Sequence, residues 1–329
     1  MPANLTPQYQ KAENAYRRAQ SAGERVECLE EMLAIIPKHK GTDKLQADLR
    51  KRLKEARAES TSEQSSEKKS RSYKVPRQGA GQVVLVGGPN AGKSRVVDEL
   101  TNASPEVTDY PFATREPLPA MMSWEDITVQ LIDTPPVTGT HIDAYLTGLV
   151  RAADLALLVF DGSSDDAPDD TEAVMRQFSE RKTLFSNRTG FDEDDFSTIH
   201  VQTLLVVTRA SDPDAETRIA FLEELTGSEF ETVRVELDNP DSCNSLREIV
   251  YHKLDVIRVY TKRPGKTADF ESPFTVPRNA TVEDLALRVH RELATTFKFA
   301  RIWGDTVHDG QSVGREHVLS DKDLVELHA

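Results

Sequence analysis

The glycine-rich segment VVLVGGPNAGKS, residues 83–94, has the residue types and the spacing that hold a phosphate group. It contains Gly87, Gly92, Lys93 and Ser94 in the Walker A pattern GxxxxGKS. The glycines let successive backbone N–H groups turn toward a β-phosphate, the lysine places a positive charge between the β- and γ-phosphates, and the serine hydroxyl is a magnesium ligand. Four apolar residues precede the loop and a helical pattern follows it, so the N-terminus of that helix is expected to add its partial positive charge.

Two further residues are candidates for the same phosphate and magnesium site. Asp133 follows the apolar run Leu131–Ile132, 40 residues after Lys93, where an aspartate at the end of a strand would hold magnesium through water. Thr114 ends the segment DYPFAT between the loop and Asp133, where a threonine can cap the γ-phosphate and complete the magnesium shell. Taken alone, each residue is common in a turn or on a surface. Its position in the chain relative to the loop is what makes it a candidate.

Apolar runs of strand length recur between residues 81 and 257, at 83–86, 128–132, 155–160 and 201–207. Polar segments of helix length separate these runs. Near-continuous apolar strands that alternate with helices indicate a parallel sheet covered on both faces. We therefore expect residues 81–257 to form an α/β domain.

The two ends of the chain have other patterns. Residues 1–58 carry apolar side chains at helical spacing, which predicts helices that pack together or serve as a basic docking element. Residues 59–80 are rich in Ser, Glu and Lys and predict a flexible linker. Residues 258–329 read as two strands, a helix that begins with a capping box at Thr281, and two or three further strands, which is typical of a compact β-grasp module.

Charge is distributed unevenly along the 329 residues, whose net charge is −14. Residues 1–80 hold 17 basic against 11 acidic side chains, a net charge of +6. Residues 81–257 hold 13 against 33, a net charge of −20, and residues 258–329 are balanced at 11 against 11. Any contact with a polyanion is therefore expected from the ends of the chain.

Composition excludes several classes of protein. The two cysteines, Cys28 and Cys243, lie far apart and form no CxxC motif, which argues against a disulfide framework or a cysteine-based zinc site. The longest apolar run, Leu155–Phe160, is far shorter than the roughly 20 residues of a membrane helix. The first ten residues, MPANLTPQYQ, lack the pattern of a signal peptide. We expect a cytoplasmic protein without a membrane partner.

The segments GGPNAGKS, DYPFAT and LIDTP together resemble the Obg and developmentally regulated GTP-binding (DRG) families of GTPases. Residues 36–57, IPKHKGTDKLQADLRKRLKEAR, are similar to the helical segment that precedes the G domain in DRG proteins. Residues 255–327 resemble a TGS domain, most closely the DRG version with its RVYTK opening. The resemblance implies a P-loop NTPase fold: an N-terminal helical segment, a Ras-like G domain with a mostly parallel sheet, and a C-terminal β-grasp TGS domain.

The resemblance also implies roles for individual residues. Lys93 and Thr114 would act in catalysis, and Ser94, Thr114 and Asp133 would hold magnesium. The residues implied to contact the nucleotide are Gly87, Pro89, Asn90, Ala91, Gly92, Lys93, Ser94, Arg95, Thr208, Arg209, Ser211 and Asp212. The implied ligands are Mg²⁺ with GTP or GDP, and K⁺ at Asn90. The implied partners are the ribosome or RNA, contacted through the TGS domain and the basic N-terminal helices.

One departure from the family pattern concerns hydrolysis. The family motif DxPG reads here Asp133-Thr-Pro-Pro136, and the motif glycine donates its backbone N–H to the γ-phosphate. Proline has no N–H, so this donor is missing or rebuilt, with the next amide, that of Val137, as the candidate replacement. Val137 occupies the position of the glutamine that orients water in Ras-like GTPases, although apolar residues are usual there in this branch. We therefore expect slow or absent hydrolysis.

Two other departures concern the base and the switch. The guanine motif NKxD reads Thr208-Arg-Ala-Ser211, so the aspartate that holds guanine N1 and N2 is replaced by Ser211 or displaced to Asp212. The late SA-type guanine loop is replaced by Val-Glu-Leu-Asp-Asn at 235–239, and switch II is short. Weak discrimination between purines is expected. Three functions stay open: a slow DRG-like GTPase acting at the ribosome or on RNA, a non-hydrolysing nucleotide-binding or interaction module, and an ATPase of relaxed specificity.

Overall fold

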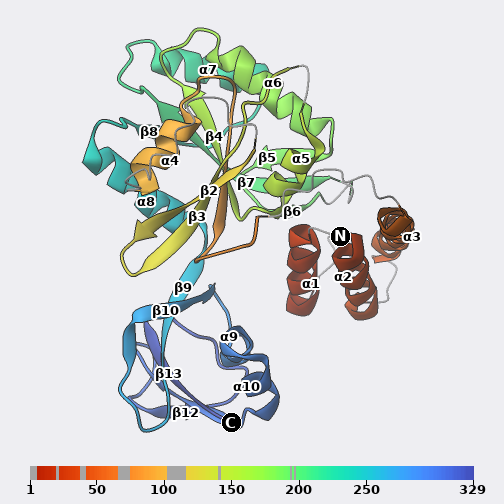
Figure 1. Cartoon of the computed structure of the whole chain (residues 1–329), viewed down its shortest axis with the longest axis vertical. Coiled ribbons are helices and arrows are strands. Elements are labelled where there is room, and N and C mark those ends of the chain that lie inside the picture. The colour runs from red at the N-terminus through yellow and green to blue at the C-terminus, as the bar shows by residue number, and fades with distance from the viewer. Residues whose placement is uncertain are drawn as a thin grey trace.

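A computed structural model describes residues 6–19, 22–37, 42–65, 75–101, 116–139, 142–192, 195 and 198–329. Along the chain it shows a group of helices, an α/β domain with one large sheet, and a smaller C-terminal domain with a sheet of its own (Figure 1). The expected fold class, a mostly parallel α/β domain followed by a β-grasp module, is confirmed.

The described residues of the N-terminal region form three helices: α1 Pro7–Arg18, α2 Ala22–Ile35 and α3 Asp43–Ser65. The Thr6 hydroxyl caps α1 by accepting the backbone N–H of Tyr9 at 3.2 Å, which satisfies one of the free donors of the first turn. Tyr9, Leu29, Met32 and Leu49 are fully buried among the three helices and form their common core. The apolar spacing of the sequence therefore produced the expected helices.

The range expected as a linker, 59–80, is structured at both of its ends. α3 extends into it as far as Ser65. Further along, Val75 is buried in the core of the central domain, and the Ala80 N–H donates to the Thr128 carbonyl at 2.7 Å. Apolar burial and backbone pairing therefore attach residues 75–80 to the α/β domain, which composition alone did not reveal.

In the part of the central domain that the structure describes, the sheet has eight strands: β1 Gln82–Val86, β2 Leu118–Trp124, β3 Ile127–Asp133, β4 Leu155–Asp161, β5 Thr183–Ser186, β6 Gly190–Phe191, β7 Ile199–Thr208 and β8 Glu231–Val235. The core order is β2-β3-β1-β4-β7, and β5 and β8 pair in parallel with the first and second halves of β7. Among the described residues, β2 and β6 run antiparallel to their neighbours, and the other neighbouring strands of this sheet pair in parallel. The four expected apolar runs are β1, β3, β4 and β7, at the centre of the sheet.

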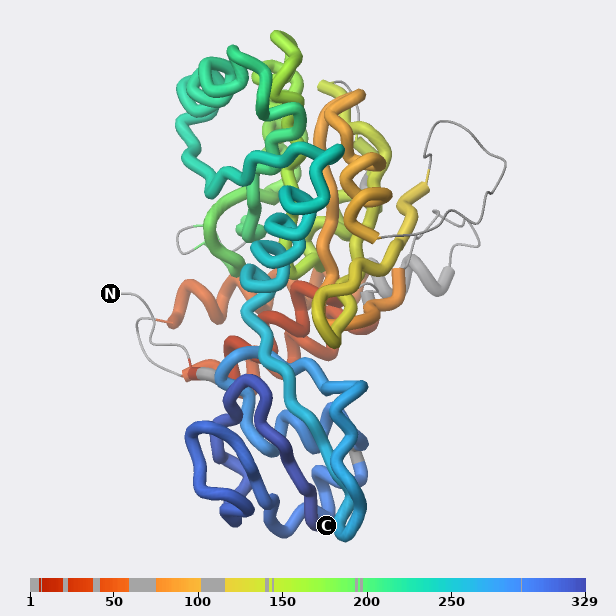
Figure 2. Tube along the Cα trace, turned by 90° about the vertical axis from the view of Figure 1, so that its left-hand side faces the viewer, coloured from red at the N-terminus to blue at the C-terminus, as the bar shows by residue number. Residues whose placement is uncertain are grey.

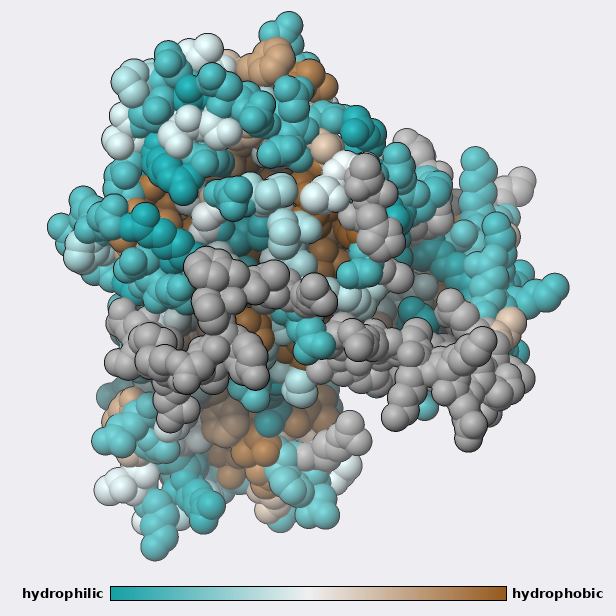
Figure 3. Space-filling model, turned by 45° about the horizontal axis from the view of Figure 1, so that its top comes forward, coloured by the Kyte–Doolittle hydropathy of each residue, from teal (hydrophilic) through white to brown (hydrophobic). Residues whose placement is uncertain are grey.

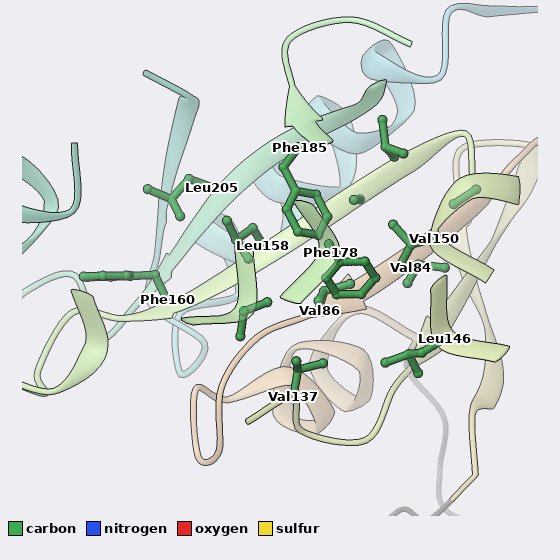
Figure 4. Packing of buried hydrophobic residues seen from close by; sticks show 14 of the residues in the cluster. Val84, Val86, Val137, Leu146, Val150, Leu158, Phe160, Phe178, Phe185 and Leu205 are labelled. Atoms are coloured by element: carbon green, nitrogen blue, oxygen red, sulfur yellow. The ribbon is translucent and has the colours of Figure 1, made fainter. Parts of the chain in front are cut away.

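Helices cover both faces of this sheet: α4 Lys93–Thr101, α5 Ala144–Ala152, α6 Ala167–Ser179, α7 Ala215–Thr226 and α8 Pro240–Lys253. Side chains of α4 and α8 pack on one face, and those of α5, α6 and α7 pack on the other. Alternate strand residues supply the two cores, because successive side chains of a strand point to opposite faces. Figure 4 shows the second core, where Val86 and Leu158 meet Phe178.

The C-terminal domain is a five-stranded sheet with two short helices. Its elements are β9 Val256–Lys262, β10 Asp269–Pro277, α9 Val282–Val289, α10 Arg291–Thr296, β11 Phe299–Trp303, β12 Gln311–Val313 and β13 Asp323–His328, with strand order β10-β9-β13-β11-β12. Thr281 and Asp284 form the expected capping box. The single helix expected after Thr281 is two helices instead, because His290 has an extended backbone and its Nδ1 accepts the Glu292 N–H at 3.3 Å.

The three regions touch one another. α1 lies against the α/β domain (Figures 1 and 2). Arg17 of α1 donates to the Arg151 carbonyl at 3.2 Å and to the Ala153 carbonyl at the end of α5. Lys11 of α1 also pairs with Asp284 of α9 at 2.6 Å. In the view of Figure 3 the surface is mostly hydrophilic over the central domain, while hydrophobic side chains gather on the C-terminal domain. Within the described residues, no helix is both long and apolar enough to span a bilayer.

Candidate nucleotide-binding site

The phosphate loop connects the end of β1, Val86, to the start of α4, Lys93. A Cβ atom on Gly87 would lie 2.7 Å from the backbone carbonyl oxygen of Val159 on the neighbouring strand, so only glycine fits. Asn90 and Gly92 have positive φ values, 57° and 98°, which turn the chain back toward the helix. The loop therefore has the strand–turn–helix context that the motif predicts.

Lys93 points back into this loop. Its side chain is 6% exposed, and its Nζ donates to the carbonyl oxygens of Gly87 and Gly88 at 3.0 and 2.8 Å. Burial lowers the pKa of Lys93 to about 8, although the nearby Asp133 carboxylate acts in the opposite direction. The ammonium is thus held by two carbonyls inside the loop, next to the backbone N–H groups that face a phosphate in such loops.

Ser94 and Asp133 form the second part of the site. The Ser94 Oγ donates to Asp133 Oδ2 at 2.6 Å, across the adjacent ends of α4 and β3. Burial raises the pKa of the Asp133 carboxyl, and the Ser94 hydroxyl and Lys93 oppose that shift. Asp133 Oδ1 is buried without a hydrogen-bond partner among the described residues. An unpaired carboxylate oxygen beside a serine hydroxyl is a set of hard oxygen donors that fits magnesium and its waters.

Thr114, the expected threonine of this site, lies outside the described residues. Pro89 and Asn90 are exposed at the tip of the loop, whereas Ala91 is buried beneath it. Arg95 does not reach the loop: it forms an ion pair with Asp238, which follows β8. Of the residues expected near the phosphates, the structure thus brings Gly87, Lys93, Ser94 and Asp133 together and directs Arg95 elsewhere.

Neither Pro136 nor Val137 offers a free backbone donor toward the loop. Pro136 is exposed and lacks an N–H. The Val137 N–H, the candidate replacement, donates to the Gly87 carbonyl at 3.2 Å. The Val137 side chain is 2% exposed and packs into the core beside Val86 (Figure 4). Both the backbone and the side chain of Val137 are therefore occupied by contacts inside the protein.

The segment expected to recognise the base begins at the end of β7. The Thr208 Oγ1 lies 3.0 Å from the Ala91 carbonyl oxygen and 3.2 Å from that of Phe160, so it ties this segment to the phosphate loop. Arg209 has a φ of 51° and pairs with Asp161 at the end of β4. Both residues therefore contribute to the architecture of the edge where the strands end.

Ser211 and Asp212 differ in what they contact. Asp212 Oδ1 accepts from the Arg218 guanidinium at 2.7 Å and from the Asp214 N–H at 3.0 Å, and these hydrogen bonds hold its pKa below the usual value. The Ser211 N–H donates to Glu236 Oε1 at 2.6 Å. Sequence reasoning missed Glu236. The signal that could have identified it is an acidic residue directly after β8, in the place of the late guanine loop.

Two family models match separate parts of the chain. The model described as 50S ribosome-binding GTPase matches residues 82–188, and the TGS domain model matches residues 257–329. The first match spans the phosphate loop and Asp133, and the second coincides with the C-terminal sheet. The GTPase domain implies nucleotide binding.

Relatives match along most of the chain. A GTP-binding protein of Methanocaldococcus jannaschii is 25% identical over 92% of this chain and 92% of its own length. Developmentally-regulated GTP-binding protein 2 of Bos taurus is 23% identical over 92% of this chain and 98% of its own length. The YchF GTPase of Schizosaccharomyces pombe has a similar fold, with a TM-score of 0.51 and 12% identity over 77% of this chain and 99% of that structure. The chain therefore contains a GTPase domain followed by a C-terminal TGS domain, and it is similar along most of its length to GTP-binding proteins that include the developmentally regulated (DRG) ones.

Proposed function

We propose that this GTP-binding protein takes up GTP with magnesium at the loop 87–94, and that it hydrolyses GTP slowly or not at all. The arrangement of Lys93, Ser94 and Asp133 carries the binding part of the proposal. A buried ammonium, a serine hydroxyl and an unpaired carboxylate oxygen lie together where β1 and β3 end. These groups match the charge and the ligand preferences of a magnesium-bound phosphate chain.

Each residue has a definite task in binding. Lys93 exchanges its two carbonyl partners for the phosphate oxygens, so that its charge meets a negative charge instead of two dipoles. Ser94 Oγ and, through water, Asp133 would hold magnesium, which neutralises the charge of the β- and γ-phosphates when it is bound. We assign K⁺ to the exposed face of the loop at Asn90, on the family resemblance.

Slow hydrolysis rests on the Pro136–Val137 segment. Phosphoryl transfer depends mainly on positioning and on charge stabilisation around the γ-phosphate. Pro136 has no N–H to donate, and the Val137 N–H is bonded to the Gly87 carbonyl at 3.2 Å. The buried Val137 side chain has no polar group to orient water. Losing one preorganised donor in other active sites costs roughly a hundred- to a thousandfold in rate.

Single-turnover GTP hydrolysis by the native protein and by Pro136→Gly, with potassium present, tests this proposal. Glycine restores an N–H and a free φ, so the variant should hydrolyse GTP faster by roughly tenfold or more. Pro135→Gly is the matched control, because it leaves position 136 without an N–H. Equal rates for the native protein and Pro136→Gly would contradict the role of Pro136. Parallel titrations with GTP and ATP separate the GTPase from the ATPase alternative.

We further propose that the ends of the chain contact the ribosome or RNA. Lys44, Arg50, Lys51 and Lys54 of α3 are exposed, and the rest of the N-terminal segment is also net basic. Arg263 and Lys266 are exposed in the turn that follows β9, whereas Lys262 is held by Glu326 at 2.9 Å and lies over the ring of Trp303. The observation that favours this contact is the exposed basic face of α3, because phosphate backbones bind clustered Lys and Arg.

A further inference from the structure

Two loops border the expected base site, and each carries a residue of interest. Ser211 stands where the guanine-recognising aspartate of the family motif is expected, and Glu236 lies in the segment 235–239 that stands in place of the SA-type late loop. Position 211 therefore has no carboxylate of its own, whereas the late loop has one at position 236. Glu236 can serve the base site only if the two positions lie close together.

They do meet, because the two strands end side by side. β7 and β8 are parallel neighbours, and Thr208 pairs with Val235 at the last position of each strand. Ser211 and Glu236 follow within three residues of those ends. Glu236 Oε1 accepts the Ser211 N–H at 2.6 Å. The Glu236 carboxylate thus lies beside the backbone of Ser211, the position where the family motif has an aspartate.

The loop that carries Glu236 is itself held in place. The Glu236 N–H donates to Ser242 Oγ at 3.0 Å, and its carbonyl accepts the Asn239 N–H at 3.0 Å. Asp238 pairs with Arg95, which ties the loop to the helix of the phosphate loop. The carboxylate therefore has a defined position relative to the phosphate site, which a specificity residue requires.

We propose that Glu236 selects guanine in this protein, an inference that rests on the proposed nucleotide binding at the loop 87–94. Guanine presents two adjacent donors, N1–H and the N2 amine, which a carboxylate accepts in a bidentate manner. Oε1 keeps a lone pair after it accepts the Ser211 N–H, and Oε2 has no partner among the described residues. Adenine presents a lone pair at N1 instead, so the same carboxylate rejects it.

Other carboxylates near these loops are engaged in different contacts. Asp212 is bonded to Arg218 and to the Asp214 N–H. Asp161 pairs with Arg209, and Asp238 pairs with Arg95. Glu236 therefore replaces the missing aspartate, and discrimination against adenine is stronger than the altered NKxD motif alone suggests.

The test measures the affinities of GDP, IDP and ADP for the native protein and for Glu236→Gln. Glutamine keeps an acceptor for the Ser211 N–H but loses the charge and the second acceptor oxygen. IDP lacks only the N2 amine, so the ratio of GDP to IDP affinity reports the base contact directly. We expect this ratio to fall by roughly tenfold or more in Glu236→Gln, with ADP affinity unchanged or higher. Unchanged ADP affinity also shows that the variant is folded.

The double variant Ser211→Asp/Glu236→Ser returns the carboxylate to position 211 and should recover the preference for GDP. Glu231→Gln, at the opposite end of β8, is the matched control and should keep the native ratio. The proposal would be overturned if the ratio of GDP to IDP affinity fell in Asp212→Asn and stayed at the native value in Glu236→Gln. Equal binding of GDP and ADP by the native protein would overturn it and leave phosphate binding intact. Binding of no nucleotide at all would overturn the proposed function as well.

Discussion

Lys93 is a charged residue in an unusual environment. The Lys93 ammonium lies inside the phosphate loop and donates to two carbonyls of the same turn. Burial in this turn is the main reason why the pKa of Lys93 falls to about 8. A cation whose own partners are neutral dipoles gains when an anion replaces them. The environment of the Lys93 ammonium therefore favours a negatively charged ligand.

We expect Lys93→Ala to weaken nucleotide affinity by about tenfold or more. A charge-assisted hydrogen bond to such a group is worth about 1.5–3 kcal/mol, and alanine removes it. Titration with a fluorescent GDP analogue measures the change. Lys298→Ala, on the C-terminal domain, removes an exposed lysine and should leave the affinity at the native value. Native affinity in Lys93→Ala would remove the main support for the phosphate site.

At the scale of elements, Arg258 joins the central and C-terminal domains. This β9 residue is 5% exposed, and its guanidinium donates to Asp321 at 2.9 Å and to Asp126 at 3.1 Å, and also to Glu125. Glu125 and Asp126 form the turn between β2 and β3 of the central sheet, and the Tyr260 hydroxyl also donates to Asp126. One cation therefore holds three carboxylates from two domains.

We expect Arg258→Met to lower the free energy of unfolding by about 1–3 kcal/mol. Methionine keeps part of the apolar volume but leaves three carboxylates close together without a cation, and their partial exposure limits the cost. Urea unfolding followed by tryptophan fluorescence suits this test, because Trp124 lies in the central domain and Trp303 in the C-terminal domain. Arg278→Met, which removes an exposed pair with Asp255, should change stability little.

The same cluster should give the stability a pH dependence of known sign. Burial raises the pKa of Asp126 and Asp321, but hydrogen bonds from Tyr260 and Arg258 outweigh burial and leave both values below the ordinary range. Such carboxyls stabilise the fold above their unfolded pKa of about 3.9 and lose that contribution as the pH falls through the folded values. The stability difference between the native protein and Arg258→Met should therefore be full at pH 6 and shrink below about pH 4. A difference that stays constant down to pH 3 would contradict this assignment.

At the scale of the whole molecule, the two ends of the chain differ from its centre in net charge. The central domain is strongly acidic, whereas the N-terminal segment is basic and the C-terminal domain is balanced. The surface that approaches a polyanion should therefore be the helical end, with α3 in contact. In the proposed function, nucleotide binding and polyanion binding therefore use different parts of the chain.

We expect the triple variant Lys44→Glu/Lys51→Glu/Lys54→Glu to lose co-sedimentation with ribosomes at physiological salt. Each phosphate contact contributes about 0.7–0.9 to the slope of log affinity against log salt, so the slope for RNA binding should fall by roughly two to three. Nucleotide affinity should stay native, because α3 lies outside the phosphate site. If Arg263→Glu/Lys266→Glu abolishes binding and the α3 variant does not, the contact belongs to the TGS domain instead.

Local patterns in the chain were enough to predict much of this protein. The phosphate loop, the four central strands, the N-terminal helices and the capping box at Thr281 all depend on residues within about ten positions of one another. Such features follow from propensity and periodicity, which act over short stretches of chain.

Other features appeared only when distant segments came together. Glu236 reaches Ser211 because β7 and β8 end in register, and no local pattern links residues 25 positions apart. The Val137 N–H donates to the Gly87 carbonyl, and Arg258 contacts Asp126, 132 positions away. Both contacts exist because packing brings distant segments together. A hydrogen bond depends on distances of about 3 Å, and the packing of whole elements sets those distances. The sequence therefore predicted which chemical groups are present, and the packing determined which of them meet.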